Sequence, residues 1–386
     1  MIWTGELNRR HAFEAKVGFY DTTLRDGEQT VGVVLMPEDK LEIARALSEA
    51  GVERIEAGFP RVSADDWEAV RLISEAGLEA EIWGFSRAVQ ADVEALVELG
   101  VGASVVESPL SELKLRALGI SREDMLGRIR QAVAYAAGSG IRVAYFGVDS
   151  TRAEPDFYDA AYTTAVEAGA SEVVVVDTIG VAGPESVADL VGRTRELVGP
   201  EVPVHFHGHN DFGLATANAV AAARAGAQWI HGTLNGMGER AGNANLGEVA
   251  LTLRAVYGVE TALDLRRAHA LSDRVRELSG YELEPWKPLV GENLFRRESG
   301  AVASQFHDPP SIEPYSSELV AADRGIVLGK KSGIDSIRIK CEELGLDVPE
   351  EAQRELLDAV KKLGTDKRGL VTDDEFRRLV AEGGTA

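Results

Sequence analysis

Strand-like and helix-like segments alternate with an even rhythm from about Val17 to Gly258, and this alternation constrains the fold more than any other feature. The eight predicted strands are Val17–Asp21, Arg54–Ala57, Glu81–Phe85, Ala103–Val106, Arg142–Phe146, Val173–Val176, the stretch around His205, and Trp229–Leu234. The helices that follow them are Pro37–Glu49, Ala64–Ala76, Ala91–Leu99, Arg122–Ala137, Asp156–Ala168, Glu185–Leu197, Leu214–Ala225 and Leu246–Tyr257. Eight such units predict an α/β fold with a closed (β/α)8 TIM barrel.

An open doubly wound sheet is the alternative α/β architecture, but it seldom needs eight units in so even a rhythm. Gly236 and Gly238 form a GxG pair, yet the third glycine, Gly242, comes one residue too late for a dinucleotide-binding fingerprint. We therefore do not expect a nicotinamide cofactor. A chain of 386 residues accommodates a barrel of about 250 residues together with an extension.

Beyond Gly258 the alternation stops. We divide the chain into an N-terminal arm (1–16), a TIM-barrel catalytic domain (17–280), a linker or lid segment (281–330) and a helical C-terminal subdomain (331–386). The helices predicted in the last part are Ile334–Leu344, Pro349–Leu363 and Thr372–Ala381, with residues 364–369 separating the last two. The linker is polar but carries the aromatic residues Trp286, Phe295, Phe306 and Tyr315. Because aromatic rings need a surface to pack on, we expect this segment to cover the barrel mouth of a neighbouring chain in a homodimer.

The composition excludes several classes of function. Hydrophobic residues make up 45% of the chain, and its net charge of −22 argues against nucleic acid or an anionic membrane surface as the main partner. The single cysteine, Cys341, excludes internal disulfides and cysteine-based zinc sites. No apolar run approaches the roughly 18 residues that span a bilayer, and the first residues lack the apolar core of a signal peptide. We therefore predict a soluble, cytoplasmic protein.

The stretch HFHGHND, residues 205–211, carries the strongest chemical signal. The chain has only seven histidines, and three of them alternate here, so that in a strand His205, His207 and His209 share one face. Imidazoles two residues apart near a strand end are typical of half of a metal site. The alternative is a polar strand end with solvated histidines.

Active sites of such barrels lie where the strands run into the following loops. Strand one ends in DTTLRDGEQ (residues 21–29), strand two near Glu56, strand three at Arg87, strand six at Thr178 and strand eight in NGMGERAGN (residues 235–243). Any one of these polar ends is ordinary for a loop, but together they converge on one rim. We predict Arg25, Glu56 and Thr178 as catalytic residues and Arg25, Gln29, Arg87 and Thr178 as substrate-binding residues.

Asp26, His207, His209 and the carboxamide of Asn243 provide a mixed nitrogen and oxygen ligand set. Such ligands suit Mn²⁺, Mg²⁺, Zn²⁺, Co²⁺ or Fe²⁺, and the absence of a thiolate gives no preference for a soft metal. A metal held there would chelate a 2-oxo acid through its keto and carboxylate oxygens. Arg25 offers paired donors to a carboxylate or a developing enolate. A non-haem iron oxygenase uses similar ligands, but it normally has a β-sandwich fold.

Several motifs together resemble one enzyme family. They are DTTLRDGEQTVGV (residues 21–33), IEAGFP (55–60), HGHND (207–211), NGMGERAGNANLGE (235–248), GEN..RRESG (291–300) and LGKKSG (328–333). This pattern is similar to that of 2-isopropylmalate and homocitrate synthases, and citramalate synthases and related metal-dependent lyases share part of it. The resemblance implies a Claisen-type condensation of acetyl-CoA with a 2-oxo acid on a divalent metal, followed by thioester hydrolysis. Such an enzyme is an acyltransferase.

Residue by residue, the resemblance makes Asp26, His207 and His209 the metal ligands, with Asn243 as the candidate for a fourth. It also places Arg25 beside the reacting carbonyl, and it places Thr178 on the substrate carboxylate.

The chain departs from the family pattern at the residues that handle protons. A family glutamate after strand five appears here as Val148, a family histidine in an ESGIH motif appears as Val302, and a family tyrosine corresponds to Ile312. After strand four, a TSPIH-like stretch reads ESPLS (residues 107–111). The residues expected to bind the metal are present, whereas the residues expected to transfer protons differ from those of the family. His231, His307, Glu107 and Asp149 are possible substitutes that the sequence alone does not rank.

Three functions are compatible with these residues. The first is a synthase that joins an acyl-CoA to a 2-oxo acid, and the second is a metal-dependent aldolase or lyase that acts on a 2-oxo acid without CoA. The GEN…LGKKSG extension favours the synthase, whereas the changed proton relay motivates the lyase. The third is an inactive barrel kept as a binding subunit, which the intact Arg25, Asp26, His207 and His209 argue against.

Overall fold

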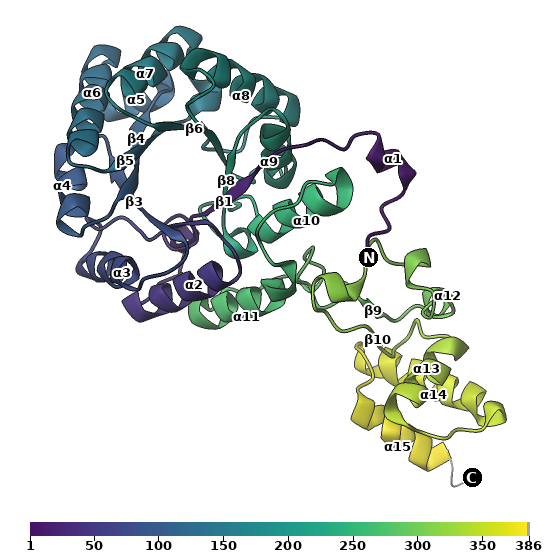
Figure 1. Cartoon of the computed structure of the whole chain (residues 1–386). Helices are drawn as coiled ribbons and strands as arrows, with labels where there is room; N and C mark the ends of the chain where they lie inside the picture. Colours follow the sequence, from purple (N-terminus) through teal and green to yellow (C-terminus); the bar gives the residue numbers. More distant parts are fainter. Residues whose placement is uncertain (384–386) are drawn as a thin grey trace. The chain divides into compact units, whose positions relative to one another are not determined.

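The computed structural model describes residues 1–383, which form two compact units: one is Glu6–Glu282, and the other combines Met1–Gly5 with the described residues from Leu283 onward. The first unit contains a closed barrel of eight parallel strands in the order β1 to β8 (Figure 1). The strands are β1 Gly18–Asp21, β2 Arg54–Glu56, β3 Glu81–Arg87, β4 Ala103–Pro109, β5 Arg142–Val148, β6 Glu172–Asp177, β7 Val204–Gly208 and β8 Trp229–Gly232. The predicted TIM barrel is confirmed.

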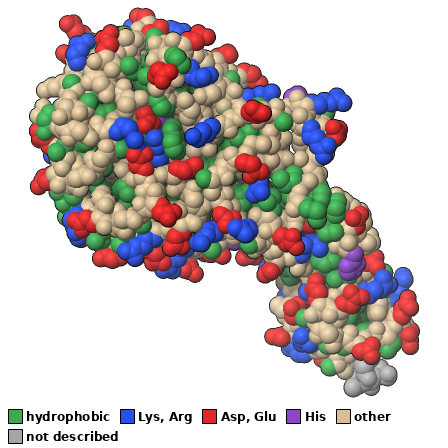
Figure 2. Space-filling view, viewed as in Figure 1, with side chains coloured by type: hydrophobic (Ala, Val, Ile, Leu, Met, Phe, Trp, Pro, Cys, Tyr) green, Lys and Arg blue, Asp and Glu red, His purple; other side chains and the backbone are tan. Residues whose placement is uncertain are grey.

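Helices surround the barrel on its outer side (Figure 1). They are α2 Pro37–Glu49, α3 Ala64–Glu75, α4 Gln90–Glu98, α5 Glu112–Leu118, α6 Arg122–Gly138, α7 Pro155–Glu167, α8 Pro184–Val198, α9 Ala215–Arg224, α10 Leu246–Tyr257 and α11 Ala268–Ser279. A short helix, α1 Glu6–Arg9, precedes the barrel in the segment expected to be an irregular arm. On the face that Figure 2 shows, acidic and basic side chains are interspersed. None of the described helices combines the length and apolar character needed to cross a membrane.

The structure of the barrel unit contains helix α5, Glu112–Leu118, which was not predicted, and it differs from the sequence prediction at two further places. Helix α11 lies beyond Gly258, where the alternation was expected to stop, and packs against α2 by burying Leu271 and Val275. Strands β3, β4 and β5 continue to Arg87, Pro109 and Val148, past the ends of their apolar runs. The mouth of the barrel accepts polar inward side chains, so the loss of hydrophobicity does not end strand pairing there.

The interior of the barrel is layered. Its central layer is apolar and aromatic, and consists of Tyr20, Trp83, Phe85, Ala103, Val105, Ala144, Phe146, Val174 and Val176. At the amino-terminal ends of the strands lies a buried ion pair between Arg54 and Glu172, with an N–O distance of 2.6 Å. The Arg54 guanidinium carbon lies 3.6 Å from the centre of the Trp229 ring, and His205 Nε2 contacts Glu172 at 2.6 Å. The charges are thus compensated inside the barrel.

The second unit contains a small helical core. Its elements are β9 Arg296–Arg297, α12 Gly300–Ala303, β10 Gly325–Ile326, α13 Ile334–Leu344, α14 Glu350–Lys367 and α15 Asp373–Gly383, and β9 pairs with β10 in parallel. Residues 384–386 of the predicted subdomain lie outside the described part of the chain. Residues 368–372 separate α14 from α15, so the predicted break at 364–369 was placed too early, because α14 continues through Gly364 to Lys367. A Cβ atom at Gly364 would lie 3.0 Å from the Gly329 Cα, so the glycine permits a close approach of two backbones.

The aromatic residues of the linker segment have different surroundings. Phe295 and Tyr315 are buried within the second unit, with ring centres 5.8 Å apart, and Phe306 is also buried there. Trp286 is 74% exposed. Three of the four rings therefore pack within the chain, and Trp286 is the one that stays exposed.

Removal of the Glu172 carboxylate tests the buried ion pair. Glu172→Ala leaves Arg54 with only the partly exposed Glu81 as an ion-pair partner, 3.1 Å from its Nε atom, so we expect the free energy of unfolding to fall by up to about 3–5 kcal/mol in urea denaturation. The control is Glu196→Ala, which removes an exposed carboxylate from α8 and should change stability by less than about 0.5 kcal/mol.

The same pair predicts a pH dependence. Burial acts to raise the pKa of Glu172, but its bonds to His205 and Arg54 lower it to about 2. A lowered pKa in the folded state means that the contribution is complete above about pH 4.5 and is lost as the pH falls toward 2. The stability gap between the wild type and Glu172→Ala should therefore narrow over that interval, and a constant gap would contradict the assignment.

Candidate metal centre and active site

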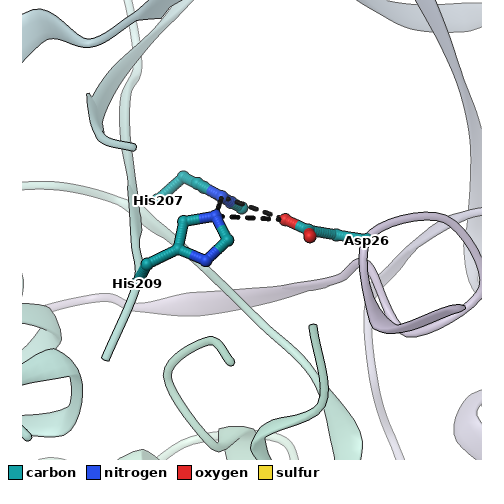
Figure 3. A group of neighbouring side chains, drawn as sticks. All are labelled: Asp26, His207 and His209. Atoms are coloured by element: carbon teal, nitrogen blue, oxygen red, sulfur yellow. Dashed lines mark hydrogen bonds and ion pairs between the residues drawn. The ribbon is translucent and has the colours of Figure 1, made fainter. Parts of the chain in front are cut away.

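One carboxylate and two imidazoles converge at the mouth of the barrel (Figure 3). Asp26 follows β1, His207 lies on β7, and His209 follows it directly, so barrel closure brings the two strand ends together. The Asp26 Oδ2 atom lies 3.2 Å from His207 Nε2 and 3.6 Å from His209 Nε2. The two Nε2 atoms are 3.3 Å apart. All three side chains are at most 5% exposed.

The surrounding loop prepares His209 as a ligand. Its Nδ1 atom lies 3.2 Å from the carbonyl oxygen of Gly242. A carbonyl only accepts hydrogen bonds, so Nδ1 carries the proton and Nε2 presents its lone pair toward Asp26. Burial, with the nearby His207, lowers the pKa of His209 to about 4, which keeps the ring neutral near pH 7. Metal-binding histidines are typically oriented through the opposite ring nitrogen in this way.

Asn243 lies beside the same group. Its Nδ2 atom donates to the carbonyl oxygen of Met237 at 3.0 Å, while its Oδ1 atom is buried and accepts no hydrogen bond. A Cβ atom at Gly238, which has φ of 147°, would lie 2.3 Å from Asn243 Nδ2 and 3.5 Å from Asp26 Oδ1. Only glycine therefore fits between these two side chains.

The residues fit a divalent cation. Asp26 Oδ1 and Asn243 Oδ1 are both buried without a hydrogen-bond partner, which is costly unless another group engages them. With His207 and His209 they form a mixed nitrogen and oxygen set that suits Mn²⁺, Mg²⁺, Zn²⁺, Co²⁺ or Fe²⁺. His207 Nδ1 is also buried without a partner, so the orientation of this ring comes from packing.

Arg25 is held rigidly beside the group. Its Nε atom donates to Glu56 Oε2 at 2.8 Å, its Nη1 atom lies 3.6 Å from Asp26 Oδ2, and its guanidinium stacks 4.4 Å from the centre of the Phe85 ring. Its Nη2 atom is buried and has no hydrogen-bond partner. Arg25 is therefore oriented with one donor available for a ligand.

Glu56 is fully buried and engaged. It accepts hydrogen bonds from Arg25, from the Tyr20 hydroxyl at 3.1 Å, and from Thr22 through a short contact. With these donors around it, the carboxylate orients Arg25 and has no free position for proton transfer.

Burial opposes the negative charge of Asp26, but Arg25 and His207 outweigh it and lower the pKa of Asp26 below its ordinary value.

The other predicted residues lie farther from this group or already have partners. Thr178 Oγ1 accepts from the Asp149 backbone N–H at 2.7 Å, and the Thr178 carbonyl accepts from Arg240. Arg87 is 53% exposed and pairs with Asp92 at 2.7 Å. Gln29 is exposed and lines a cavity of about 390 Å³.

That cavity lies between the loops that follow β1 and β2, with Phe85 of β3 in its lining. Its lining includes Arg25, Gln29, Phe59 and Phe85 together with apolar residues of the loop that follows β1. The predicted substrate residues Arg25 and Gln29 thus share one cavity.

The groups that support the ligands are the backbone carbonyls of Gly242 and Met237, which no side-chain pattern in the sequence reveals. The sequence feature that indicates a specialised loop here is the glycine-rich stretch that contains Gly238 and Gly242, since both residues have positive φ.

Fold and site together define a class, a (β/α)8 barrel with a candidate metal centre at the carboxyl ends of its strands. A family model described as HMGL-like matches residues 16–275. The chain belongs to this HMGL-like family.

Relatives and solved structures agree with the family. The chain is 45% identical to a homocitrate synthase of Methanopyrus kandleri over 94% of this chain and 91% of that protein. It is 43% identical to a probable 2-isopropylmalate synthase of the same organism over 90% of this chain and 70% of that protein. An HMG-CoA lyase structure from Bacillus subtilis has a TM-score of 0.64 at 21% identity and covers 72% of this chain and 98% of that one. At this identity, the similarity to the lyase structure shows a shared fold alone.

The candidate centre predicts metal binding. Purified protein should bind about one divalent ion per chain, measured by atomic emission after dialysis, and His207→Ala should lower this stoichiometry because one of the buried ligands is lost. His307→Ala, which removes an exposed histidine of the second unit, is the matched control and should bind as the wild type does. Full occupancy in His207→Ala would refute the assignment.

Proposed function

We propose that this chain is a divalent-metal-dependent synthase that condenses acetyl-CoA, or another acyl-CoA, with a 2-oxo acid. The products are free CoA and a 2-substituted malate or homocitrate-like acid. The observation that carries the proposal is the buried group of Asp26, His207 and His209 beside the free Nη2 donor of Arg25. Support comes from the homocitrate synthase relative at 45% identity over nearly all of both chains.

The chain's own residues account for the electrophilic half of the reaction. Asp26, His207, His209 and Asn243 would hold a divalent cation, which polarises the C2 carbonyl of a 2-oxo acid when bound. Arg25 Nη2 donates to the oxygen on which negative charge develops, and Glu56 and Phe85 keep the guanidinium in place. We propose that Thr178, Gln29 and Arg87 contribute to substrate binding. Thr178 and Arg87 would have to exchange their present partners to do so.

The proton-handling half differs from the family pattern. Val148 lies at the end of β5 and packs against the apolar interior of the barrel. A valine cannot transfer a proton, so substrates that depend on a carboxylate at this position should react slowly.

A thiol-release assay across a panel of 2-oxo acids tests the reaction class. We expect CoA release with acetyl-CoA and at least one acid, and slow turnover with 2-oxoisovalerate and 2-oxoglutarate. Fast turnover with either named acid would show that valine in place of the family's glutamate at position 148 does not slow the reaction. No CoA release with any acid, together with aldol cleavage of a 4-hydroxy-2-oxo acid, would replace the synthase by the lyase.

We also propose that the segment 281–330 acts as a lid on the barrel of a second copy in a homodimer, and that the protein is cytoplasmic. The exposed Trp286 ring supports a partner surface, and the buried, unpaired Cys341 suits a reducing compartment.

Truncation after Gly280 tests the lid. The shortened protein keeps the described barrel strands, so we expect it to be soluble, but to lose activity and dimerisation. Activity and light scattering are compared with those of the full chain. A truncated monomer with full activity would contradict both the lid role of the segment and the homodimer.

A further inference from the structure

Most carboxylates at the strand ends of the barrel already have partners. Asp21 accepts two hydrogen bonds from Thr23, and Glu56 is bonded as described above. Asp149 accepts from Ser111 at 2.5 Å and from Arg152, while the two oxygens of Asp177 accept from Thr151 and from backbone N–H groups. These groups hold loops in place and are not available for proton transfer.

Glu107 differs from them. Within the described residues, its carboxylate makes no hydrogen bond and no ion pair, and the side chain is partly buried near the end of β4. Ala103 and Val105 of the same strand point into the barrel interior, and the two-residue period of a strand puts Glu107 on that inward face. An unpartnered carboxylate thus faces the mouth of the barrel.

The neighbours of Glu107 place it next to the candidate metal centre. Its register partner on β5 is Phe146, whose ring centre lies 5.2 Å from that of His207. The rings of Phe146 and Phe85 are 6.4 Å apart, and Arg25 stacks on Phe85. Phe146 is therefore a neighbour of both Glu107 and His207, and Phe85 is a neighbour of both Phe146 and Arg25.

The charges that face Glu107 come from several elements. Burial raises its pKa, and Asp92 on α4 acts in the same direction. Arg25 after β1, Arg87 on β3 and Lys114 on α5 act to lower it, but burial outweighs them. A carboxylate with a raised pKa is a stronger base than an exposed one, and its protonated form is more populated near neutral pH.

We propose that Glu107 is the group that moves the proton in the condensation; this inference rests on the proposed synthase function. The carboxylate takes a proton from the α-carbon of the acyl thioester, and the C–H electron pair becomes the enolate. The enolate carbon bonds to C2 of the 2-oxo acid, and the carbonyl π pair becomes an alkoxide. Glu107 returns its proton to the alkoxide, and water then hydrolyses the thioester to release CoA.

The other titratable groups that the sequence suggested as substitutes are less suited to this role. His231 lies inside the barrel, stacked 4.0 Å from the Tyr20 ring, with Nε2 3.0 Å from His205 Nδ1. Asp149 is held by Arg152 and Ser111. His307 belongs to the other unit and is exposed. Val148 is the diagonal neighbour of Glu107 on the sheet, because it lies two residues beyond Phe146, the register partner of Glu107 on β5.

The test compares wild type, Glu107→Gln, and Glu98→Gln, which removes the same charge from an exposed position on α4. Two rates are measured on the same samples, CoA release with the best 2-oxo acid and exchange of acetyl-CoA methyl protons with D₂O. Glu107→Gln should lose about 10²-fold or more in both rates and lose the acidic limb of its pH profile. Its metal content and melting temperature should stay unchanged. Glu98→Gln should resemble the wild type, and Glu107→Gln/Val148→Glu should regain part of the lost rate.

The outcomes separate the two proposals. Equal rates and pH profiles in wild type and Glu107→Gln overturn the role of Glu107 while the synthase stands. A change in KM for the 2-oxo acid with an unchanged kcat also overturns it, and makes Glu107 a specificity residue. Wild-type proton exchange without CoA release, lost in Glu107→Gln, supports Glu107 but contradicts condensation. If the wild type catalyses neither proton exchange nor CoA release, both the role of Glu107 and the synthase function are overturned.

Discussion

Closure of the barrel is the constraint on which the site depends. Pairing of β1 with β8 and of β7 with β8 puts the ends of the first and seventh strands at the same rim, and Asp26 then meets His207 at 3.2 Å. Neither histidine is close to Asp26 in sequence, so the group exists only in the closed fold. Loops finish the arrangement, because carbonyls of the segment after β8 orient His209 and Asn243.

The interior of the barrel separates charges by layer. The Arg54–Glu172 pair occupies the amino-terminal end, the aromatic layer lies above it, and the candidate metal centre occupies the carboxyl-terminal end. An apolar layer between two charged ones lowers the local dielectric response, which strengthens each pair and penalises each unpaired group. This explains why the partnerless carboxylate of Glu107 has a raised pKa whereas Asp26 beside Arg25 has a lowered one.

Much of the fold could be predicted from the sequence because strands buried on both faces and amphipathic helices have different patterns of apolar residues. Helices α2 and α10 were predicted to the residue, and the group of Asp26, His207 and His209 was predicted because strand ends meet at one rim. The continuation of β4 through Glu107 was not predicted, since a polar residue ends an apolar run. The continuation of α14 through Gly364 was missed for a related reason: packing against Gly329 overrides the low helix propensity of glycine.

The roles of individual polar residues were harder to predict, because they depend on partners distant in sequence. Glu56 is one carboxylate among many until Arg25, Tyr20 and Thr22 are seen around it, and Glu107 is distinguished only by the partners that it lacks. Sequence patterns identify which residue types reach the rim. The contacts decide which of them position a neighbour and which remain free to react.

The central claim is that His207 and His209 together bind one divalent ion through their Nε2 atoms. Pulsed electron paramagnetic resonance of the Mn²⁺-loaded protein, prepared with ¹⁵N-labelled histidine, measures this directly. The account predicts couplings from two directly bound imidazole nitrogens, which disappear in part when His207 is replaced by alanine. A spectrum without histidine nitrogen coupling in the wild type would contradict it.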